Sequence, residues 1–269
     1  MRALDTIRSA IFVAATVGIP TVAQASTIID LTTGDSGGSN GALYVWTDFS
    51  ATGSGVIDAF LRIQNRGTEQ GYNHSLGHNV PWDTKPGLHT HDIQIEDLVV
   101  RNITGVDYYE FLLDINESNG HDNELLSLDN IQIYTRNSPI TSPDESFSHL
   151  GDLRYNNDVG ANGDTTVELN YSLNHGSGSG DMFFYVPVSL FAGTLPSDYV
   201  YFYSLFGGSN SSDAGFEEWA MLQNVTGGGG SGGAGGGGGI NQTPVPEPGT
   251  MLLLGTGLAF AARRARKRA

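Results

Sequence analysis

The chain has 269 residues, of which 39% are hydrophobic and 16% are charged, and it contains no cysteine. The lack of cysteine excludes disulfide bonds, thiolate metal sites and cysteine nucleophiles. There are 13 basic and 29 acidic residues, so the formal net charge is −16. Such a charge repels phosphate backbones and argues against nucleic-acid binding, while aromatic and β-branched residues are too plentiful for a disordered chain.

Residues 1–25 have the pattern of a secretory signal peptide. Arg2 and Arg8 form a short basic region, which an apolar run follows. Ala23 and Ala25 supply the small-x-small pattern of a cleavage site, after which Ser26 becomes the first residue. The apolar run is too short to span a bilayer comfortably. We therefore expect a signal helix that the Sec-type export machinery reads and signal peptidase removes.

Residues 26–225 have the pattern of a β domain. Apolar and polar residues alternate most clearly from Val167 to Leu173. The other predicted strands are 42–47, 56–64, 92–102, 108–115, 130–135, 182–190, 199–206 and 218–223. Clusters of glycine and serine, such as residues 36–40, predict turns between them. We expect an all-β domain, a jelly-roll-like β-sandwich of about nine strands, with Pro187 on an edge strand or at a bulge.

A candidate calcium site lies between two predicted strands. Asp114, Asn116, Ser118 and Asp122 are close in sequence, and calcium takes six to eight oxygen ligands from such side chains and from carbonyl groups. The spacing begins like an EF-hand loop, but the glycine of its sixth position and the glutamate of its twelfth are missing. Turns rich in Asp and Asn explain the same residues without a metal. Calcium is therefore an optional cofactor, and none is required.

Four histidines are candidates for a transition-metal site. His89 and His91 would face the same side at the start of a strand, and His74 or His78 could add a ligand. The segment that carries them is long and polar, however, and isolated histidines are ordinary in such loops.

Two motifs suggest hydrolases but fit them poorly. Residues 34–38 match the nucleophile loop of chymotrypsin-like proteases, yet no histidine precedes Ser36 in the predicted mature chain, so a turn is the better interpretation. Glu217 and Glu218 are neighbours on a predicted strand and point to opposite faces, so they cannot be the facing pair of a glycosidase. We expect no catalytic residues and no enzymatic activity.

A glycine-rich segment separates the predicted β domain from the end of the chain. Residues 227–239 contain eleven glycines in thirteen positions. This composition predicts a flexible linker over residues 226–243, with a root-mean-square reach of roughly 25 Å.

The last residues combine three elements in order. Pro246, Glu247 and Pro248 come first, and an uncharged segment, 251–262, follows. The basic end consists of Arg263, Arg264, Arg266, Lys267 and Arg268. Twelve helical residues cover about 18 Å, less than the ~30 Å of a hydrocarbon core, so the segment suits a transient insertion better than a permanent anchor. The basic end would stay on the cytoplasmic side.

This order resembles the PEP-CTERM sorting tail of exported bacterial proteins, over residues 244–269. In that family an exosortase, an integral membrane protein, recognises and processes the tail at the outer face of the inner membrane. The resemblance implies that Pro246, Glu247 and Pro248 are the recognised motif, in a Gram-negative-type envelope. It implies a chain that is transiently anchored in the inner membrane and then placed on the outer surface or outside the cell.

Together these features predict an exported, exosortase-processed surface or extracellular-matrix protein with a structural or adhesive role, assisted by calcium if the acidic loop binds it. Extracellular polysaccharide is a candidate partner. A carbohydrate-binding, lectin-like module is the main alternative, because surface tryptophans can stack on sugars. A secreted polysaccharide hydrolase is a weaker alternative.

Overall fold

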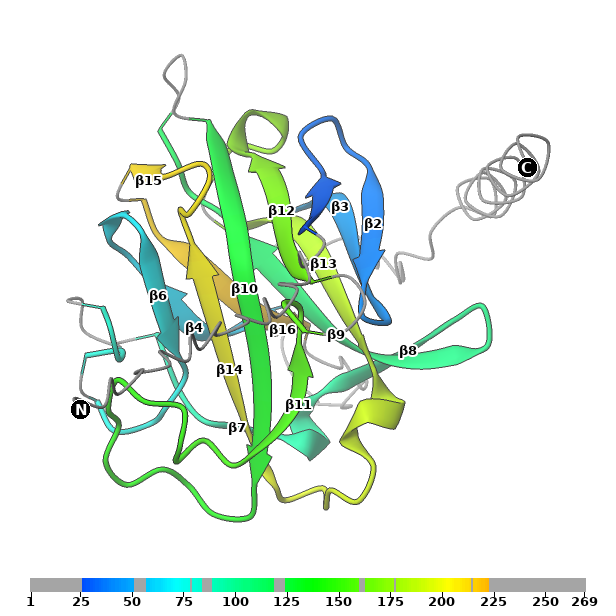
Figure 1. Cartoon of the computed structure of the whole chain (residues 1–269), viewed down its shortest axis with the longest axis vertical. Helices are drawn as coiled ribbons and strands as arrows, with labels where there is room; N and C mark the ends of the chain where they lie inside the picture. Colours follow the sequence, from blue (N-terminus) through cyan, green and yellow to red (C-terminus); the bar gives the residue numbers. More distant parts are fainter. Residues whose placement is uncertain are drawn as a thin grey trace, which may run out of the picture. The chain divides into compact units, whose positions relative to one another are not determined.

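The computed structural model describes residues 26–50, 57–77, 79–83, 89–118, 124–159, 163–176, 178–213 and 215–222. These residues form sixteen β-strands and no α-helix (Figure 1). Three short 3-10 helices lie among the strands: η1 (Ile95–Asp97), η3 (Tyr171–Leu173) and η4 (Val188–Phe191). The domain is all-β, as the alternating pattern predicts. None of the helices in these ranges is long and apolar enough to reach across a membrane.

Fourteen of the strands form two seven-stranded sheets. The strands of sheet A are, in spatial order, β1 (Ser26–Asp30), β12 (Asp164–Asn170), β10 (Leu125–Arg136), β14 (Tyr199–Phe206) and β6 (Glu69–Tyr72), with β11 (Asp152–Asn156) beside β10 and β7 (Ile93–Gln94) beside β14. Those of sheet B are β2 (Ser36–Ser39), β3 (Ala42–Ser50), β13 (Ser179–Pro187), β9 (Val106–Asp114), β16 (Glu217–Leu222) and β4 (Ile57–Ile63), with β8 (Val99–Ile103) beside β9. The two remaining strands, β5 (Arg66–Gly67) and β15 (Ser212–Asp213), pair with each other.

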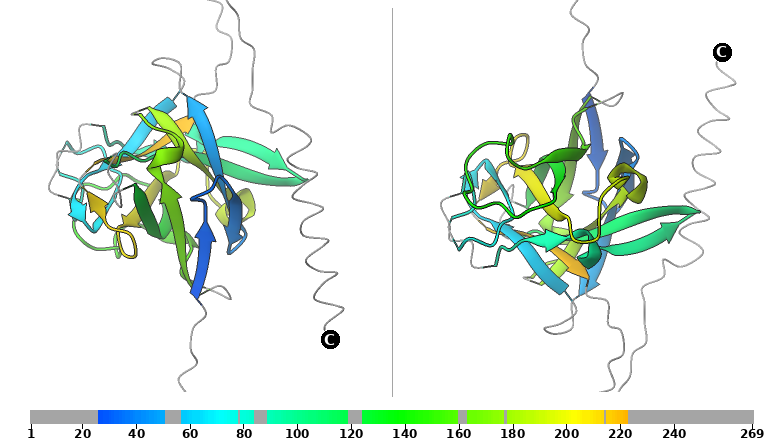
Figure 2. Two further views of the ribbon diagram at one scale, coloured as in Figure 1. Left: turned by 90° about the horizontal axis from the view of Figure 1, so that it is seen from above. Right: turned by 90° about the horizontal axis from the view of Figure 1, so that it is seen from below.

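Eight principal strands define the connectivity. Numbered in chain order, they are β4, β6, β9, β10, β12, β13, β14 and β16, and they lie in the orders 1-8-3-6 in sheet B and 2-7-4-5 in sheet A. These are the strand orders of a jelly roll. β1 extends sheet A through a parallel pairing with β12, and β2 with β3 extends sheet B. The hairpin of β8 and the start of β9 projects from the rest of the domain (Figure 2).

The two sheets pack face to face through aromatic side chains. The ring of Phe202 in sheet A lies 4.6 Å from Trp219, 5.1 Å from Phe111 and 5.7 Å from Phe60 in sheet B, between centroids. The Trp219 Nε1 donates a hydrogen bond to Ser204 Oγ at 3.1 Å, so the polar atom of this ring is satisfied inside the core. Burial of this apolar surface is the main force that holds the sheets together.

A second apolar cluster lies on the outer face of sheet A. It is made of tyrosines on neighbouring strands, where Tyr134 is paired with Tyr201 and Tyr203 with Tyr72. Ile140 and Leu150, from the loop after β10, complete the cluster. This loop therefore packs on the sheet through a tyrosine-rich surface.

The prediction of about nine strands is wrong, since the described residues contain sixteen. β5, β7 and β15 have only two residues each, which is too short to produce a period in the sequence. Residues 92–102, predicted as one strand, are divided by η1 into β7 and β8. The predicted positions of β4, β9, β14 and β16 agree closely with the structure, whereas β3 ends three residues later, and β13 begins and ends three residues earlier, than predicted.

The turn predicted at residues 36–40 is also wrong over most of its length, because Ser36–Ser39 form β2. A Cβ atom on Gly37 would lie 2.6 Å from Cγ2 of Ile29, and one on Gly38 would lie 2.9 Å from the carbonyl oxygen of Ala42. The glycines therefore allow close approach of neighbouring backbone and side chains within a strand.

Pro187 was expected on an edge strand or at a bulge, and it is instead the last residue of β13, between β3 and β9. The pairing of β13 with β3 ends at Tyr185, while Pro187 still pairs with Tyr108 of β9. Pro187 thus has a partner strand on one side only, which is the local equivalent of an edge.

Several predicted segments lie outside the described residues. These are the signal peptide with Ala23 and Ala25, the linker 226–243, and the tail 244–269 with its Pro-Glu-Pro motif, apolar segment and basic end. Ser26 is the first described residue and opens β1.

The central position of Trp219 predicts a large cost for its removal. We expect Trp219→Ala to lower the free energy of unfolding by about 3–5 kcal/mol, because it leaves a cavity between the sheets and an unpaired Ser204 hydroxyl. Urea denaturation followed by tyrosine fluorescence or circular dichroism measures the change. Leu195→Ala, at a side chain that is 61% exposed, is the control and should change stability by less than about 0.5 kcal/mol. A loss below about 1 kcal/mol for Trp219→Ala would contradict this account of the core.

Candidate functional site

A groove of about 490 Å³ lies where two loops meet beside the tyrosine cluster of sheet A. One wall is formed by residues 79–83 and the other by residues 141–145, in the loop after β10. Its lining combines apolar side chains with oxygen-bearing ones: Val80, Pro81, Trp82 and Pro143 with Asn79, Asp83, Thr141, Ser142, Asp144 and Glu145. We call it the Trp82 groove.

Trp82 is held rigidly at the wall of this groove. Its φ angle is 64°, in the left-handed region that bulky residues rarely adopt. The half-buried ring packs 5.2 Å from Phe147, 5.6 Å from Tyr203 and 6.0 Å from Tyr72, between centroids. A strained backbone persists only where the surrounding packing determines it. These three contacts therefore hold the indole ring of Trp82 in one orientation.

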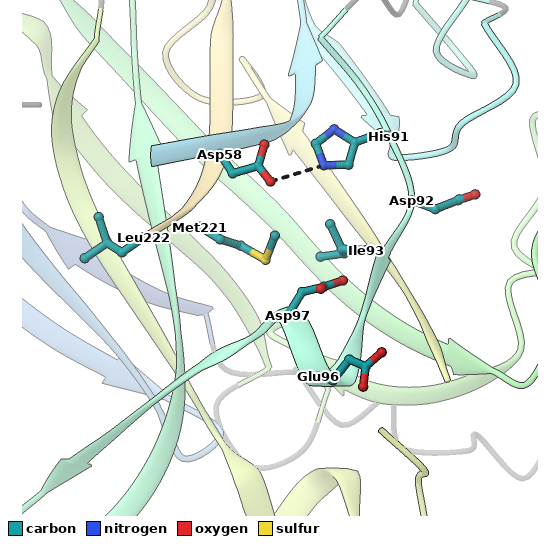
Figure 3. Close-up of a pocket in the computed structure, with 8 residues that line it drawn as sticks. All are labelled: Asp58, His91, Asp92, Ile93, Glu96, Asp97, Met221 and Leu222. Atoms are coloured by element: carbon teal, nitrogen blue, oxygen red, sulfur yellow. Dashed lines mark ion pairs between the residues drawn. The ribbon is translucent and has the colours of Figure 1, made fainter. Parts of the chain in front are cut away.

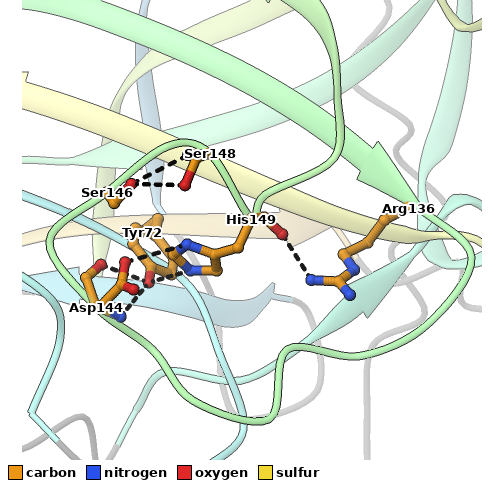
Figure 4. A network of polar contacts seen from close by, with 6 residues as sticks. All are labelled: Tyr72, Arg136, Asp144, Ser146, Ser148 and His149. Carbon is orange, nitrogen blue, oxygen red and sulfur yellow. Dashed lines mark hydrogen bonds and ion pairs between the residues drawn. The ribbon is translucent and has the colours of Figure 1, made fainter.

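A polar network fixes the opposite wall (Figure 4). The Tyr72 hydroxyl donates to the carbonyl oxygen of Asp144 at 2.8 Å and lies 3.0 Å from Nε2 of His149. Asp144 Oδ1 lies 3.1 Å from Nδ1 of His149, and Arg136 Nη1 donates to the carbonyl oxygen of His149 at 2.6 Å. Burial of the hydroxyl raises the pKa of Tyr72 to about 12, so it stays a donor at neutral pH. The loop after β10 is thus anchored to sheet A through Tyr72 of β6 and Arg136 of β10.

A second pocket, of about 470 Å³, lies beside β4 and η1 (Figure 3). Its lining residues are Asp58, His91, Asp92, Ile93, Glu96, Asp97, Met221 and Leu222. Nε2 of His91 lies 3.7 Å from Oδ2 of Asp58, and both side chains are about 40% exposed (39% and 43%). Figure 3 shows that the carboxyl group of Asp92 points away from this pair. The pocket is lined by acidic side chains, but their polar groups do not converge on one point where a ligand could be held.

The three described histidines of the predicted transition-metal site have separate surroundings. Both ring nitrogens of His74 lie within hydrogen-bonding distance of backbone atoms. His91 faces Asp58, His89 is exposed, and His78 lies outside the described residues. In the part of the chain that the structure describes, no three His, Cys, Asp or Glu side chains form a group that could hold a metal ion.

The predicted calcium ligands are partly brought together. Oδ1 of Asp114 accepts a hydrogen bond from Nδ2 of Asn116 at 3.1 Å, and its other oxygen accepts from a backbone N–H. The N–H of Ser118 donates to Oδ2 of Asp213 at 2.8 Å. Asp122 lies outside the described residues. These side chains brace the loop through hydrogen bonds, and calcium binding by them stays a prediction.

The sequence analysis missed a group of buried carboxyl groups on the outer side of sheet B. Burial raises the pKa of Asp114 to about 7 and that of Asp181 to about 8. Nearby, Glu218 is also buried, but Nε of Arg62 donates to its Oε2 at 2.6 Å. These residues come from four different strands, so no local pattern in the sequence could have joined them.

A second group of buried carboxyl groups lies inside the sandwich, where β9 ends and β16 begins. We call Glu69, Glu117 and Glu217 the Glu217 cluster. Burial raises the pKa of all three, to about 8 for Glu117. Glu217 and Trp219 occupy alternate, inward positions of β16, as the period of a strand requires. Glu217 and Glu218 do point to opposite faces, and the inward partner of Glu217 is Glu69, 148 positions earlier in the chain.

The raised pKa of Asp181 predicts a stability that falls as pH rises. The folded protein keeps the Asp181 proton that the unfolded chain releases, so this contribution declines from about pH 3.8 to about pH 8. We expect Asp181→Asn, measured by urea denaturation in chelator between pH 4 and 8.5, to reduce the pH slope by up to about 1.4 kcal/mol per pH unit. Asp152→Asn, whose side chain is 82% exposed, should leave the slope unchanged. An equal slope in Asp181→Asn would contradict the assignment.

Comparisons with known proteins identify the end of the chain. Residues 244–267 match the model of the PEP-CTERM protein-sorting motif. No curated protein and no solved structure matches the chain. The predicted resemblance of the tail is thereby confirmed. The chain carries a PEP-CTERM sorting motif, the signal of an exported protein that an exosortase processes for the cell surface.

Proposed function

We propose that the folded domain is a non-enzymatic adhesive module, which binds extracellular polysaccharide in the Trp82 groove. The observation that carries this proposal is the indole of Trp82, fixed in a strained conformation beside hydroxyl, amide and carboxyl groups. A sugar ring has an apolar face of C–H groups that packs on an aromatic ring, and its hydroxyls need hydrogen-bond partners. The groove supplies both in one place.

The charge of the groove selects among polysaccharides. Asp144 and Glu145 are exposed at its rim, and the domain as a whole is strongly acidic. Acidic polysaccharides that contain uronic acids would be repelled by these carboxylates. Neutral polysaccharides and those with free amino groups are therefore the expected ligands.

The route to the surface completes the proposal. The Sec-type machinery exports the chain, signal peptidase cleaves after Ala25, and residues 251–262 insert transiently in the inner membrane. The exosortase then reads Pro246, Glu247 and Pro248. Because Pro248 disfavours a helical backbone at Glu247, we expect an extended motif that can enter an active site without unfolding. A flexible glycine-rich linker would let that enzyme reach the motif.

The sorting proposal predicts that the two prolines matter together. In the producing cells, the double variant Pro246→Ala, Pro248→Ala should keep its C-terminal tail and accumulate in the membrane fraction. Cell fractionation and the mass of the C-terminal peptide measure this. Pro244→Ala, which changes a neighbouring proline outside the tripeptide, is the matched control and should be processed normally. Normal trimming of the double variant would refute the processing step.

The adhesive proposal predicts that Trp82 is essential for glycan binding. The protein is tested on a glycan array with neutral, amino-sugar and uronic-acid polysaccharides, with and without chelator. We expect binding to the first two classes, and we expect Trp82→Ala to weaken it by about tenfold or more, equivalent to about 1.4 kcal/mol. Trp82→Tyr, which keeps an aromatic ring, should retain most of the affinity.

Val100→Ala is the control for this series, since Val100 is an exposed apolar residue of the β8–β9 hairpin, outside the groove. It should bind like the parent protein. Each variant is checked for an unchanged circular dichroism spectrum. Absence of binding to every polysaccharide, or binding by Trp82→Ala at full strength, would reject the groove as the adhesive site.

A further inference from the structure

The Glu217 cluster closes one end of the core between the two sheets. Glu217 lies in β16 of sheet B and Glu69 in β6 of sheet A, and both take the inward positions of their strands. Glu117 follows β9 and adds a third negative charge beside them. Glu217 is 0% exposed and Glu69 is 1% exposed. Carboxyl groups in such positions are rare unless something compensates their charge.

Protein groups compensate this charge only in part, since Ser212 interacts with Glu69 and the backbone of Asn116 interacts with Glu217. Four carboxyl oxygens of the cluster are buried without a hydrogen-bond partner: both of Glu217 and one each of Glu69 and Glu117. No ion pair in the described ranges includes any of the three glutamates. The nearby Arg62 is paired with Glu218 on the other face of the sheet, and Arg66 is exposed. Among the described residues, the cluster therefore has more acceptor oxygens than donors and no basic side chain as an ion-pair partner.

The charge of the cluster can be compensated by protons or by a cation. Glu69 and Glu217 come within hydrogen-bonding reach of each other, but two carboxyl groups can hydrogen-bond only through a proton that one of them carries. One such proton engages two of the four oxygens and leaves the others unpaired. A single cation among them would neutralise the charge and engage several oxygens at once.

We propose that the Glu217 cluster binds a calcium ion, with Glu69 and Glu217 as its carboxylate ligands. Calcium suits a site that offers oxygen only, and it completes its six to eight ligands with backbone carbonyl groups and water. No three His, Cys, Asp or Glu side chains among the described residues are placed to hold a metal ion together, so the site depends on two carboxylates only. Glu117 strengthens the site by its charge.

The surrounding segments are already tied together in a way that suits an ion site. The second oxygen of Glu69 accepts from the N–H of Asn65 at 2.8 Å, and that of Glu117 accepts from the N–H of Asp213 at 2.9 Å. Ser212 Oγ donates to the carbonyl oxygen of Asn65 at 3.2 Å. Glu69 therefore uses one oxygen to bind its own loop and Glu117 uses one to bind β15, and the other oxygen of each is buried without a hydrogen-bond partner.

The experiment measures thermal unfolding of the purified protein after refolding in calcium, in magnesium or in chelator. With calcium at about 100 times its Kd, we expect the Tm to rise by roughly 5–10 °C at pH 8. Magnesium at the same concentration should have a smaller effect, because it requires a stricter octahedral geometry. Calorimetric titration with calcium alone at pH 8 should give a stoichiometry of one.

Matched variants locate the ion. Glu217→Gln keeps the shape of the side chain and removes its charge, so it should fold, be more stable than the parent protein in chelator at pH 8, and lose the calcium shift. Glu69→Gln should behave likewise. Glu218→Gln is the control, since it changes the adjacent residue on the opposite face and should keep the calcium shift. Asp114→Asn, in the loop first considered for calcium, should keep it as well.

Two results would overturn the proposal. A Tm at pH 8 that does not respond to calcium would show that protons alone compensate the cluster. A calcium shift that persists in Glu217→Gln and Glu69→Gln would place the ion elsewhere, and its loss in Asp114→Asn would place it in the loop after β9.

Discussion

The contact between the aromatic rings of Phe202 and Trp219 lies at the centre of the packing between the two sheets, which a hydrogen bond of 2.8 Å between the Tyr44 and Tyr155 hydroxyl groups also joins. The chain has no cysteine, and the described strands are not covered by any α-helix. Phe202 also packs on Phe60, 142 positions earlier in the chain. In a jelly roll, neighbouring strands are mostly distant in sequence, so these contacts form only when the whole connectivity is in place. Burial of the aromatic rings thus stabilises the fold and specifies it.

Aromatic side chains fill the middle of the sandwich, because protein interiors are packed as densely as organic crystals. The two proposed binding sites lie away from that middle, on an outer face and at an end of the sandwich. The Trp82 groove uses an outer face, where tyrosines of β6 and β14 support the indole. The Glu217 cluster lies at an end of the sandwich. There the inward position of β16 next to Trp219 is occupied by the carboxyl group of Glu217.

The sequence predicted what depends on neighbouring residues. Alternation revealed β14 and β16 nearly to their ends, and three ordered elements revealed the sorting tail. What it could not predict depends on residues far apart. The contact of Glu217 with Glu69 and the support of Trp82 by Phe147 arise only after the strands have found their partners. Gly37 was misread as part of a turn because the need for its small size comes from Ile29, a packing partner on β1.

The proposed calcium site and the sorting tail act on one chain at different stages, and the charge of the domain connects them. Residues 26–243 contain six basic and 27 acidic residues, so the folded state carries strong self-repulsion near neutral pH. Buried glutamates add to this cost until a proton or a cation compensates them. Calcium is scarce in the cytosol and abundant outside cells, where binding sites of modest affinity are filled. A cluster that binds this ion, as proposed, therefore stabilises the folded domain more after export than before it.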